Sequence, residues 1–93
     1  MKVRFYATFR NLTGKKEIEV HGVRTVGELI DYISEKYSPR IKEELLQRGR
    51  KEISGMILVN GHNILHLNGL ETELKEEDVV HVFPPAGGGD GRC

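Results

Sequence analysis

Cysteine is almost absent from this chain, since Cys93 at the very end is the only one. One thiol cannot form an internal disulfide, and a chain without four cysteines cannot hold the iron–sulfur cluster of a plant-type ferredoxin. Histidine does not supply the missing metal ligands, because the four histidines are scattered without a paired ligand spacing. We therefore expect no metal site and interpret these histidines as turn and surface residues. They are His21, His62, His66 and His81.

An excess of positive charge is missing as well. Lys+Arg and Asp+Glu both number 14, so the chain lacks the net positive field on which sequence-independent nucleic-acid binding depends. Long apolar runs are also missing, because the opening MKVRFYATFR carries charges inside every window long enough for a signal-peptide core or a membrane span. We expect a cytoplasmic protein with neither nucleic acid nor a membrane as a partner.

The first part of the chain alternates in the manner of half-buried strands. With 93 residues there is room for one small domain. Residues 3–9 place Val3, Phe5, Ala7 and Phe9 on one face, and residues 16–20 alternate again. The pattern predicts two strands paired as a hairpin, with a turn at residues 11–15.

Two helices are predicted next. Thr25 and Glu28 have the spacing of a capping box, which marks a helix start. Ser38 and Pro39 suit the N-cap and first position of a second, shorter helix that ends before Gly49. Residues 48–54 are then expected to form a charged surface connection. The first helix repeats apolar residues on one face at helical spacing, namely Val26, Leu29, Ile30, Ile33 and Tyr37.

The remaining elements complete a sheet. Residues 56–59 predict a strand ending in the turn pair Asn60-Gly61, residues 64–67 a weak strand, and residues 79–83 the last strand. Residues 70–74 and 75–78 are expected to be turns. This order predicts an α+β protein of the β-grasp arrangement, which ubiquitin shares. A four- to five-stranded mixed sheet covers one main helix plus a short second helix, and the first and last strands pair in parallel at the centre.

The chain closes with FPPAGGGDGRC, which predicts a flexible Pro/Gly tail at residues 84–93 after a domain of residues 1–83. Pro84 and Pro85 cannot extend a ladder from an interior position, so they direct the chain outward. Glycines fit a channel too narrow for a Cβ. The six residues from Pro84 to Gly89 reach about 20 Å when nearly extended, which is long enough to carry a chain end into another protein's active site.

These features resemble the MoaD/ThiS-like ubiquitin-fold sulfur carriers, which include the small subunit of molybdopterin synthase and the small archaeal modifier proteins. The resemblance covers nearly the whole chain. Its motifs are F-x-x-F/L-R at residues 5–10, T-V-x-E-L at residues 25–29, V-N-G at residues 59–61 and an acidic turn before the last strand. The strongest is F-P-P-x-x-G-G, seen here as Phe83, Pro84 and Pro85 followed by the diglycine Gly88-Gly89.

The resemblance implies that the carboxylate of Gly89 is the working group. An E1-like enzyme would activate it with ATP, and sulfur from a persulfide donor would then convert it to a thiocarboxylate. The carrier would be non-catalytic and bind no cofactor. Its tail would enter the molybdopterin synthase large subunit, so Phe83, Pro84, Pro85 and Gly87 are expected to bind partners, with Gly88 beside the reacting end. For Phe83, packing at the root of the tail and exposed docking both remain open.

The chain departs from the family pattern at its end, because Asp90-Gly91-Arg92-Cys93 follows Gly89. A carboxyl group held in a peptide bond offers no free carboxylate to attack ATP, so we expect a protease to remove residues 90–93, with a cut after Gly88 as the alternative register. Cys93 is interpreted as an incidental thiol rather than a reactive one. Two other functions stay open: a ubiquitin-like modifier conjugated to lysines, and an interaction module without carboxyl chemistry.

Overall fold

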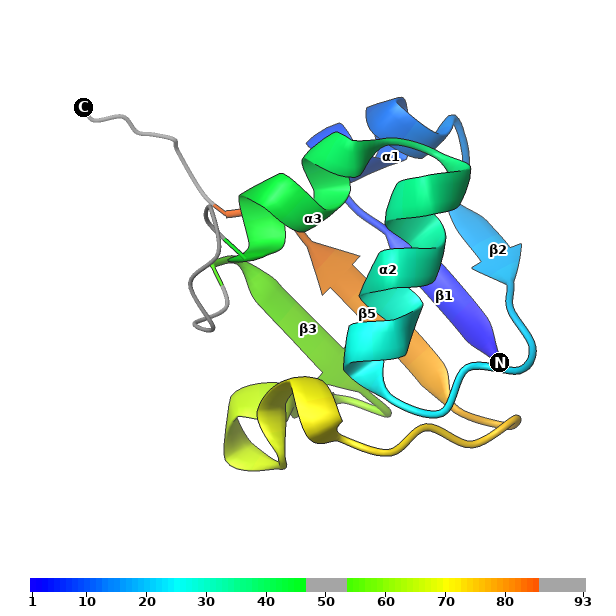
Figure 1. Cartoon of the computed structure of the whole chain (residues 1–93), viewed down its shortest axis with the longest axis vertical. Coiled ribbons are helices and arrows are strands. Elements are labelled where there is room, and N and C mark those ends of the chain that lie inside the picture. The colour runs from blue at the N-terminus through cyan, green and yellow to red at the C-terminus, as the bar shows by residue number, and fades with distance from the viewer. Residues whose placement is uncertain (47–53, 86–93) are drawn as a thin grey trace.

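Residues 1–46 and 54–85 are described by a computed structural model of the chain. In these ranges a five-stranded sheet carries the two longest helices on one face (Figure 1). The elements in chain order are β1 (Lys2–Phe5), α1 (Thr8–Thr13), β2 (Glu17–Glu19), α2 (Val26–Lys36), α3 (Pro39–Leu46), β3 (Met56–Val59), β4 (His62–Asn63), the 3-10 turns η1 (Ile64–His66) and η2 (Gly69–Glu71), and β5 (Val79–Phe83).

The strand order β2-β1-β5-β3-β4 places the first and last strands at the centre of the sheet. β1 and β5 are parallel, with Val3 opposite Val80, whereas every other neighbouring pair is antiparallel. The segment between β1 and β5 therefore crosses the sheet with its helices, as Figure 1 shows. The predicted α+β class, the mixed sheet and the central parallel pair are all confirmed.

The main helix, α2, begins as its sequence predicts. The Thr25 side chain accepts a hydrogen bond from the Glu28 backbone N–H at 3.2 Å. The Glu28 carboxylate reaches back to the backbone N–H of Arg24 at 2.8 Å, one residue beyond the usual partner in a capping box. Four of the five predicted apolar residues are buried against the sheet, and Tyr37 is half-buried beside them.

The second predicted helix is also present as α3. The Ser38 hydroxyl accepts a hydrogen bond from the Arg40 backbone N–H at 3.2 Å, and Ile41 and Leu45 are completely buried. Gly49 and most of the charged connection predicted after it lie outside the described residues. No helix in the described part of the chain combines the length and the apolar character that a membrane span needs.

A third helix, α1, replaces the predicted end of the first strand and the predicted turn at residues 11–15. β1 ends at Phe5, and Ala7 then takes a φ of 54° that no strand residue adopts. The helix ends in a left-handed Gly14, whose N–H donates to the Arg10 carbonyl. Phe9 is completely buried, so its predicted place in the core is correct. Its predicted strand conformation is wrong, because it lies in α1. β1 and β2 still pair antiparallel as predicted.

The weak strand predicted at residues 64–67 is wrong. Pairing with β3 ends after the two residues of β4, and Ile64 then starts the 3-10 turn η1, where its side chain is completely buried. The Asn63 side chain accepts a hydrogen bond from the Leu65 N–H at 2.9 Å and so starts this turn. The single turn predicted in residues 70–74 is present as η2, which spans Gly69–Glu71 and so lies one residue earlier at its start and ends before Thr72.

Candidate functional site

The predicted tail leaves the sheet at the end of β5, its central strand. Phe83 is the last strand residue, and Pro84 and Pro85 continue from it without strand pairing. All three are half-buried. Gly87, Gly88 and Gly89, with the rest of the chain to Cys93, lie outside the described residues, so their predicted roles remain predictions. The described site is therefore the root of the tail.

One side of this root lies against the start of β3. The pairing of β3 with β5 ends at Met56 opposite Phe83, which brings Gly55 opposite Pro84. Gly55 has a φ of +103°, and a Cβ built on it would lie only 2.6 Å from the carbonyl oxygen of Phe83. The same Cβ would lie 3.0 Å from the nitrogen of Pro85. Glycine is required here both by the backbone angle and by the close approach of the tail.

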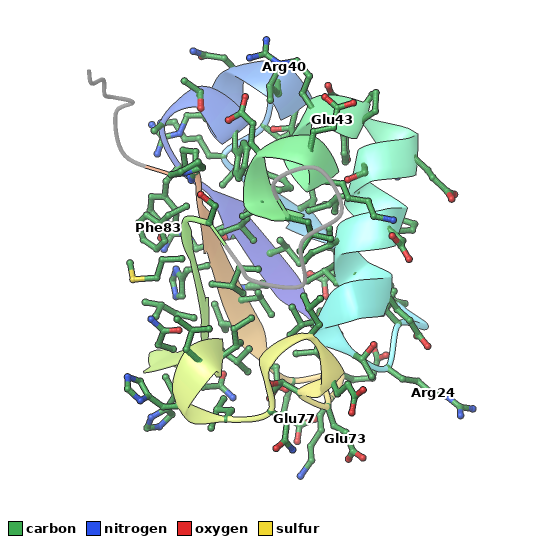
Figure 2. The ribbon with its side chains drawn as sticks, turned by 60° about the vertical axis from the view of Figure 1, so that its left-hand side comes forward. Arg24, Arg40, Glu43, Glu73, Glu77 and Phe83 are labelled. Carbon is green, nitrogen blue, oxygen red and sulfur yellow. The ribbon has the colours of Figure 1, made fainter. Side chains whose placement is uncertain are left out.

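The other side of the root carries an aromatic stack. The rings of Tyr6 and Phe83 are nearly parallel, with 4.2 Å between their centroids. The Tyr6 hydroxyl is also hydrogen-bonded to Nδ1 of His81 at 2.7 Å. These side chains alternate with buried Val82 and Phe5, so they lie on the face of the sheet that α2 does not cover, and Figure 2 shows Phe83 on that side.

The open face of the sheet divides into a charged half and an apolar half. On β1 and β2 the register places Lys2 beside Glu19 and Arg4 beside Glu17, and the second pair approaches to 3.5 Å. On β3 the outward residues are Met56 and Leu58, next to Phe83 and His81 across the ladder. Met56 is 36% exposed. The apolar half therefore continues from the root of the tail across the end of the sheet.

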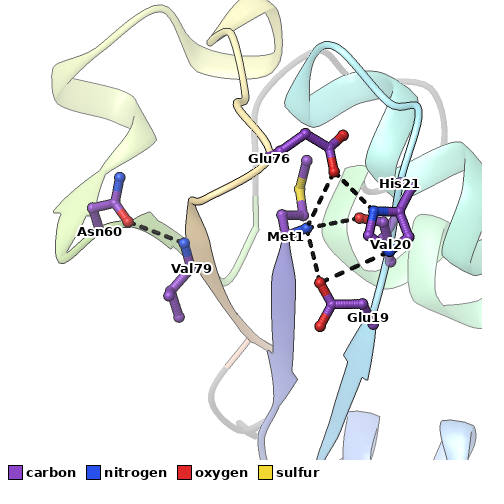
Figure 3. Close-up of polar contacts among 7 residues, drawn as sticks. All are labelled: Met1, Glu19, Val20, His21, Asn60, Glu76 and Val79. Atoms are coloured by element: carbon purple, nitrogen blue, oxygen red, sulfur yellow. Dashed lines mark hydrogen bonds and ion pairs between the residues drawn. The ribbon is translucent and has the colours of Figure 1, made fainter.

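Three of the four histidines predicted to lie at the surface are exposed. His62 and His66 are exposed, and His21 is exposed beside Glu76, with 2.8 Å between Nδ1 and Oε1 (Figure 3). His81 is the exception, since it is half-buried in the central strand under Tyr6. Within residues 1–46 and 54–85 no three His, Cys, Asp or Glu residues gather closely enough to hold a metal ion.

The fold and most of the sequence match known proteins. The ThiS family matches residues 3–89. The chain belongs to the ThiS family. Small archaeal modifier protein 3 of Haloferax volcanii is 35% identical over 91 residues, which cover 96% of this chain and 98% of that protein. The predicted resemblance to MoaD/ThiS-like sulfur carriers is thereby confirmed.

Solved structures of ThiS-like proteins share the fold. The small archaeal modifier protein 1 of Methanosarcina acetivorans superimposes with a TM-score of 0.77 at 35% identity, over 95% of this chain and 94% of that one. A Pyrococcus furiosus chain, provisionally assigned as molybdopterin converting factor subunit 1, gives a TM-score of 0.66 at 38% identity, over 91% of this chain and 95% of that one. This ThiS-family chain is therefore a small β-grasp protein of the sulfur carrier and modifier class.

The sequence correctly placed Phe83, Pro84 and Pro85 where the last strand ends, and it did not indicate that Tyr6 and Gly55 contact this segment. The signal for Tyr6 was its outward position in the alternating first strand, since an aromatic residue on the polar face has no core to fill. The signal for Gly55 was a glycine directly before an apolar strand, which often marks a close backbone approach. Neither signal names the partner, because both contacts join segments far apart in the sequence.

Proposed function

We propose that this chain is a sulfur carrier for molybdopterin, the organic part of the molybdenum or tungsten cofactor. After processing, a carboxylate oxygen of Gly89 attacks the α-phosphorus of ATP in an E1-like enzyme and releases pyrophosphate. The terminal sulfur of a persulfide donor then attacks the acyl carbon and displaces AMP. A second thiol cleaves the resulting acyl disulfide, becomes oxidised to a disulfide with the donor cysteine, and leaves a thiocarboxylate on Gly89. The large subunit of molybdopterin synthase receives this end, and the sulfur passes to a cyclic pterin precursor. The chain itself binds no cofactor, and these partners place it in the cytoplasm.

The observation that carries this proposal is the exit of the last strand. β5 is paired with β1 up to Val82 and with β3 up to Phe83, so the start of the tail is fixed to the centre of the sheet. The ThiS family match continues past this point and stops at Gly89. The residues from Pro84 to Gly89 span about 20 Å when nearly extended. A rigid domain with such a tail supports delivery of a C-terminal carboxylate into a partner's active site.

The apolar half of the open face is the surface we assign to docking. Phe83, Tyr6, Met56 and Leu58 offer aromatic and aliphatic area beside the tail, and such residues are frequent anchors at protein interfaces. A partner that covers this patch would receive the tail in the same encounter. The likeness to a Pyrococcus furiosus chain assigned as a subunit of a molybdopterin converting factor supports the large synthase subunit as one such partner.

The full chain has to be cut before it can react. Asp90 occupies the carboxyl group of Gly89 through a peptide bond, so no free carboxylate exists at the diglycine. Removal of residues 90–93 by a protease releases it, and the end of the ThiS match at Gly89 supports this register over a cut after Gly88. Cys93 then leaves with the discarded peptide, in agreement with its interpretation as an incidental thiol.

A second function, conjugation to other proteins, is favoured by the likeness to small archaeal modifier proteins. The chemistry is the same up to the acyl-adenylate, and the acceptor then becomes a lysine amine instead of sulfur. A Gly-Gly remnant on substrate lysines after protease digestion identifies this function. A pterin product formed with the large synthase subunit identifies the first one.

The experiment that tests the proposal compares the full chain with a chain ending at Gly89. Each is mixed with ATP and the E1-like enzyme of the same organism, and pyrophosphate release is measured. We expect release with the chain ending at Gly89 and none with the full chain. A chain ending at Pro85 is the matched control, because it keeps the described domain. The intact mass after addition of a sulfur donor should rise by the difference between sulfur and oxygen.

Two outcomes would contradict the proposal. Adenylation of the uncut chain would remove the need for processing. A chain that reacts equally poorly with and without residues 90–93, and that keeps the extension in its own cells, would support an interaction module without carboxyl chemistry.

A further inference from the structure

Gly55 has no place in any motif of the sequence, yet it is in close contact with the root of the tail. A Cβ at this position would meet the Phe83 carbonyl oxygen at 2.6 Å and the Pro84 carbonyl carbon at 3.1 Å. Both are backbone atoms, which cannot rotate away as the end of a flexible side chain can. Any side chain at position 55 therefore has to displace the tail from β3, by roughly 1 Å if ordinary contact distances are to be restored.

The residue before Gly55 is hydrogen-bonded to the helical layer. The backbone N–H of Ser54 donates to the carbonyl oxygen of Leu45 in α3 at 2.7 Å. Leu45 is completely buried, so this contact connects the start of β3 to the core. Displacing Gly55 instead of the tail would break that connection. A side chain at position 55 is therefore accommodated at the tail.

Tyr6 holds the opposite side of the same segment. Its ring stacks on Phe83 with 8° between the ring planes, and it follows β1 directly. The end of β1 and the start of β3 thus lie on either side of β5 at Phe83, where the tail begins. The backbone of Ala7, at φ 54° and ψ −130°, turns the chain away immediately after Tyr6.

We propose that Gly55 and Tyr6 are positioning residues that set the direction in which the tail leaves the sheet. The inference rests on the proposed function, because the direction matters only if Gly89 must reach a reacting centre. The six residues from Pro84 to Gly89 can span at most about 20 Å, so the direction in which Pro84 and Pro85 leave the sheet limits the region that Gly89 can reach. A misplacement of about 1 Å at a reacting group can lower a rate about 10²-fold.

The chain offers a matched control in Gly61, at the other end of β3. Gly61 also has a left-handed backbone, with a φ of +86°, but a Cβ there would meet no atom within 4 Å. Gly55→Ala and Gly61→Ala therefore both introduce left-handed strain, and only the first adds a clash with the tail. For chains ending at Gly89, we expect Gly55→Ala to lower kcat of adenylation by about 10²-fold. KM should stay within about threefold, and Gly61→Ala should leave both constants within that range.

Tyr6 provides a second variant that does not depend on backbone strain. Tyr6→Leu removes the stack on Phe83, whereas Tyr6→Phe keeps the ring and loses only the hydroxyl bonded to His81. We expect Tyr6→Leu to lower kcat of adenylation, whereas Tyr6→Phe should keep kcat near the value of the parent chain. The inference would be overturned if kcat fell in proportion to the melting temperature across all four variants, whether or not the substituted residue contacts the root of the tail.

The direction of the tail is measurable without any activating enzyme. A nitroxide attached to Cys93, the only thiol, broadens the amide resonances of the residues that the tail approaches in the full chain. We expect Gly55→Ala to change the set of broadened amides and Gly61→Ala to leave it unchanged. A changed pattern in the full chain, together with a chain ending at Gly89 that no E1-like enzyme adenylates, would refute the proposed function and retain the positioning role. Identical patterns in all three proteins would refute the positioning role.

Discussion

The ring of Tyr6 lies almost parallel to the ring of Phe83, at 8° and with 4.2 Å between centroids. The two residues follow the central parallel register, in which Phe5 is opposite Val82. Offset aromatic pairs of this kind contribute about 0.5–1.5 kcal/mol beyond their buried area. Of the two interpretations of Phe83 considered from the sequence, this stack supports packing at the root of the tail, and docking of a partner stays a prediction. The ring packs at the root of the tail, and it does so on the open face.

Phe83→Ala should weaken binding to the activating enzyme more than it weakens the fold. The ring is half-buried and lies outside the core cluster, so its loss leaves no cavity in the core. An aromatic anchor at the centre of an interface costs about 2 kcal/mol or more when it is truncated. We expect the dissociation constant to rise by more than about tenfold. Calorimetric titration measures the binding, and thermal unfolding measures the fold.

Val82→Ala is the matched control for this prediction. Val82 is the preceding residue of the same strand and points into the core, where it is 1% exposed. Its truncation removes buried methyl groups and leaves a cavity, so the melting temperature should fall. Binding measured at a temperature where the variant is still folded should be retained. If Phe83→Ala lowers the melting temperature as much as Val82→Ala and leaves binding intact, Phe83 is a packing residue only.

Asp78→Ala should destabilise the whole sheet. The carboxylate is 7% exposed and accepts hydrogen bonds from the Asn60 side-chain amide and the Lys75 backbone N–H, both at 2.8 Å. Asn60 in turn accepts from the N–H of Val79, so this group joins the end of β3 to the start of β5 (Figure 3). Leaving these donors unpaired should cost about 1–3 kcal/mol.

Urea unfolding measures this cost, and Asp31→Ala is its control. Asp31 is exposed and pairs with Lys42 at 2.7 Å on the surface of the helices. Such a pair contributes about 0–1 kcal/mol. Equal losses in the free energy of unfolding for the two variants would mean that Asp78 stabilises the fold no more than an exposed charged residue does.

The sequence predicted the elements whose pattern is local and missed those set by distant contacts. Alternation predicted β1, and the Thr25 cap predicted the start of α2. Both signals depend only on residues that are close together in the sequence. α1 was missed because its six residues are too few to repeat a helical period. An apolar residue such as Phe9 can fill the core from a strand or from a helix, so its expected burial did not distinguish the two conformations.

The candidate site divides in the same way. The proline pair that ends β5 is a local signal, and it predicted where the tail begins. The approach of Tyr6 and Gly55 depends on the register of β5 with two different strands, which no short window of sequence contains. The roles of Gly87, Gly88 and Gly89 stay predictions, since these residues lie outside the described part of the chain.

Thr25→Ala should destabilise the domain by about 1 kcal/mol, the usual cost of a lost N-cap. The hydroxyl accepts the Glu28 backbone N–H at 3.2 Å, and its loss leaves that donor to water. Thr25→Ser keeps the hydroxyl and should stay near the parent protein. Thr8→Ala serves as the control, because Thr8 is exposed and the N-cap of α1 is Ala7. Chemical unfolding that ranks Thr8→Ala with Thr25→Ala would contradict a capping role.

The last prediction concerns Glu76, which lies 2.8 Å from the His21 ring and 3.9 Å from the amino group of Met1 (Figure 3). The hydrogen bond from His21 is the largest cause that lowers the pKa of Glu76 below its ordinary value of 4.5. Smaller contributions in the same direction come from the backbone of Gly22 and the positive amino group. Partial burial opposes them.

A carboxyl group whose pKa is lower in the folded than in the unfolded chain stabilises the fold above the unfolded pKa, and this contribution is lost as the pH falls through the folded pKa. We therefore expect Glu76→Gln to reduce the slope of melting temperature against pH below about pH 4.5. The neighbouring substitution Glu77→Gln is its matched control. In His21→Ala the Glu76 side-chain resonances, followed by NMR, should titrate closer to the ordinary value. An unchanged titration of Glu76 in that variant would show that the histidine is not the cause.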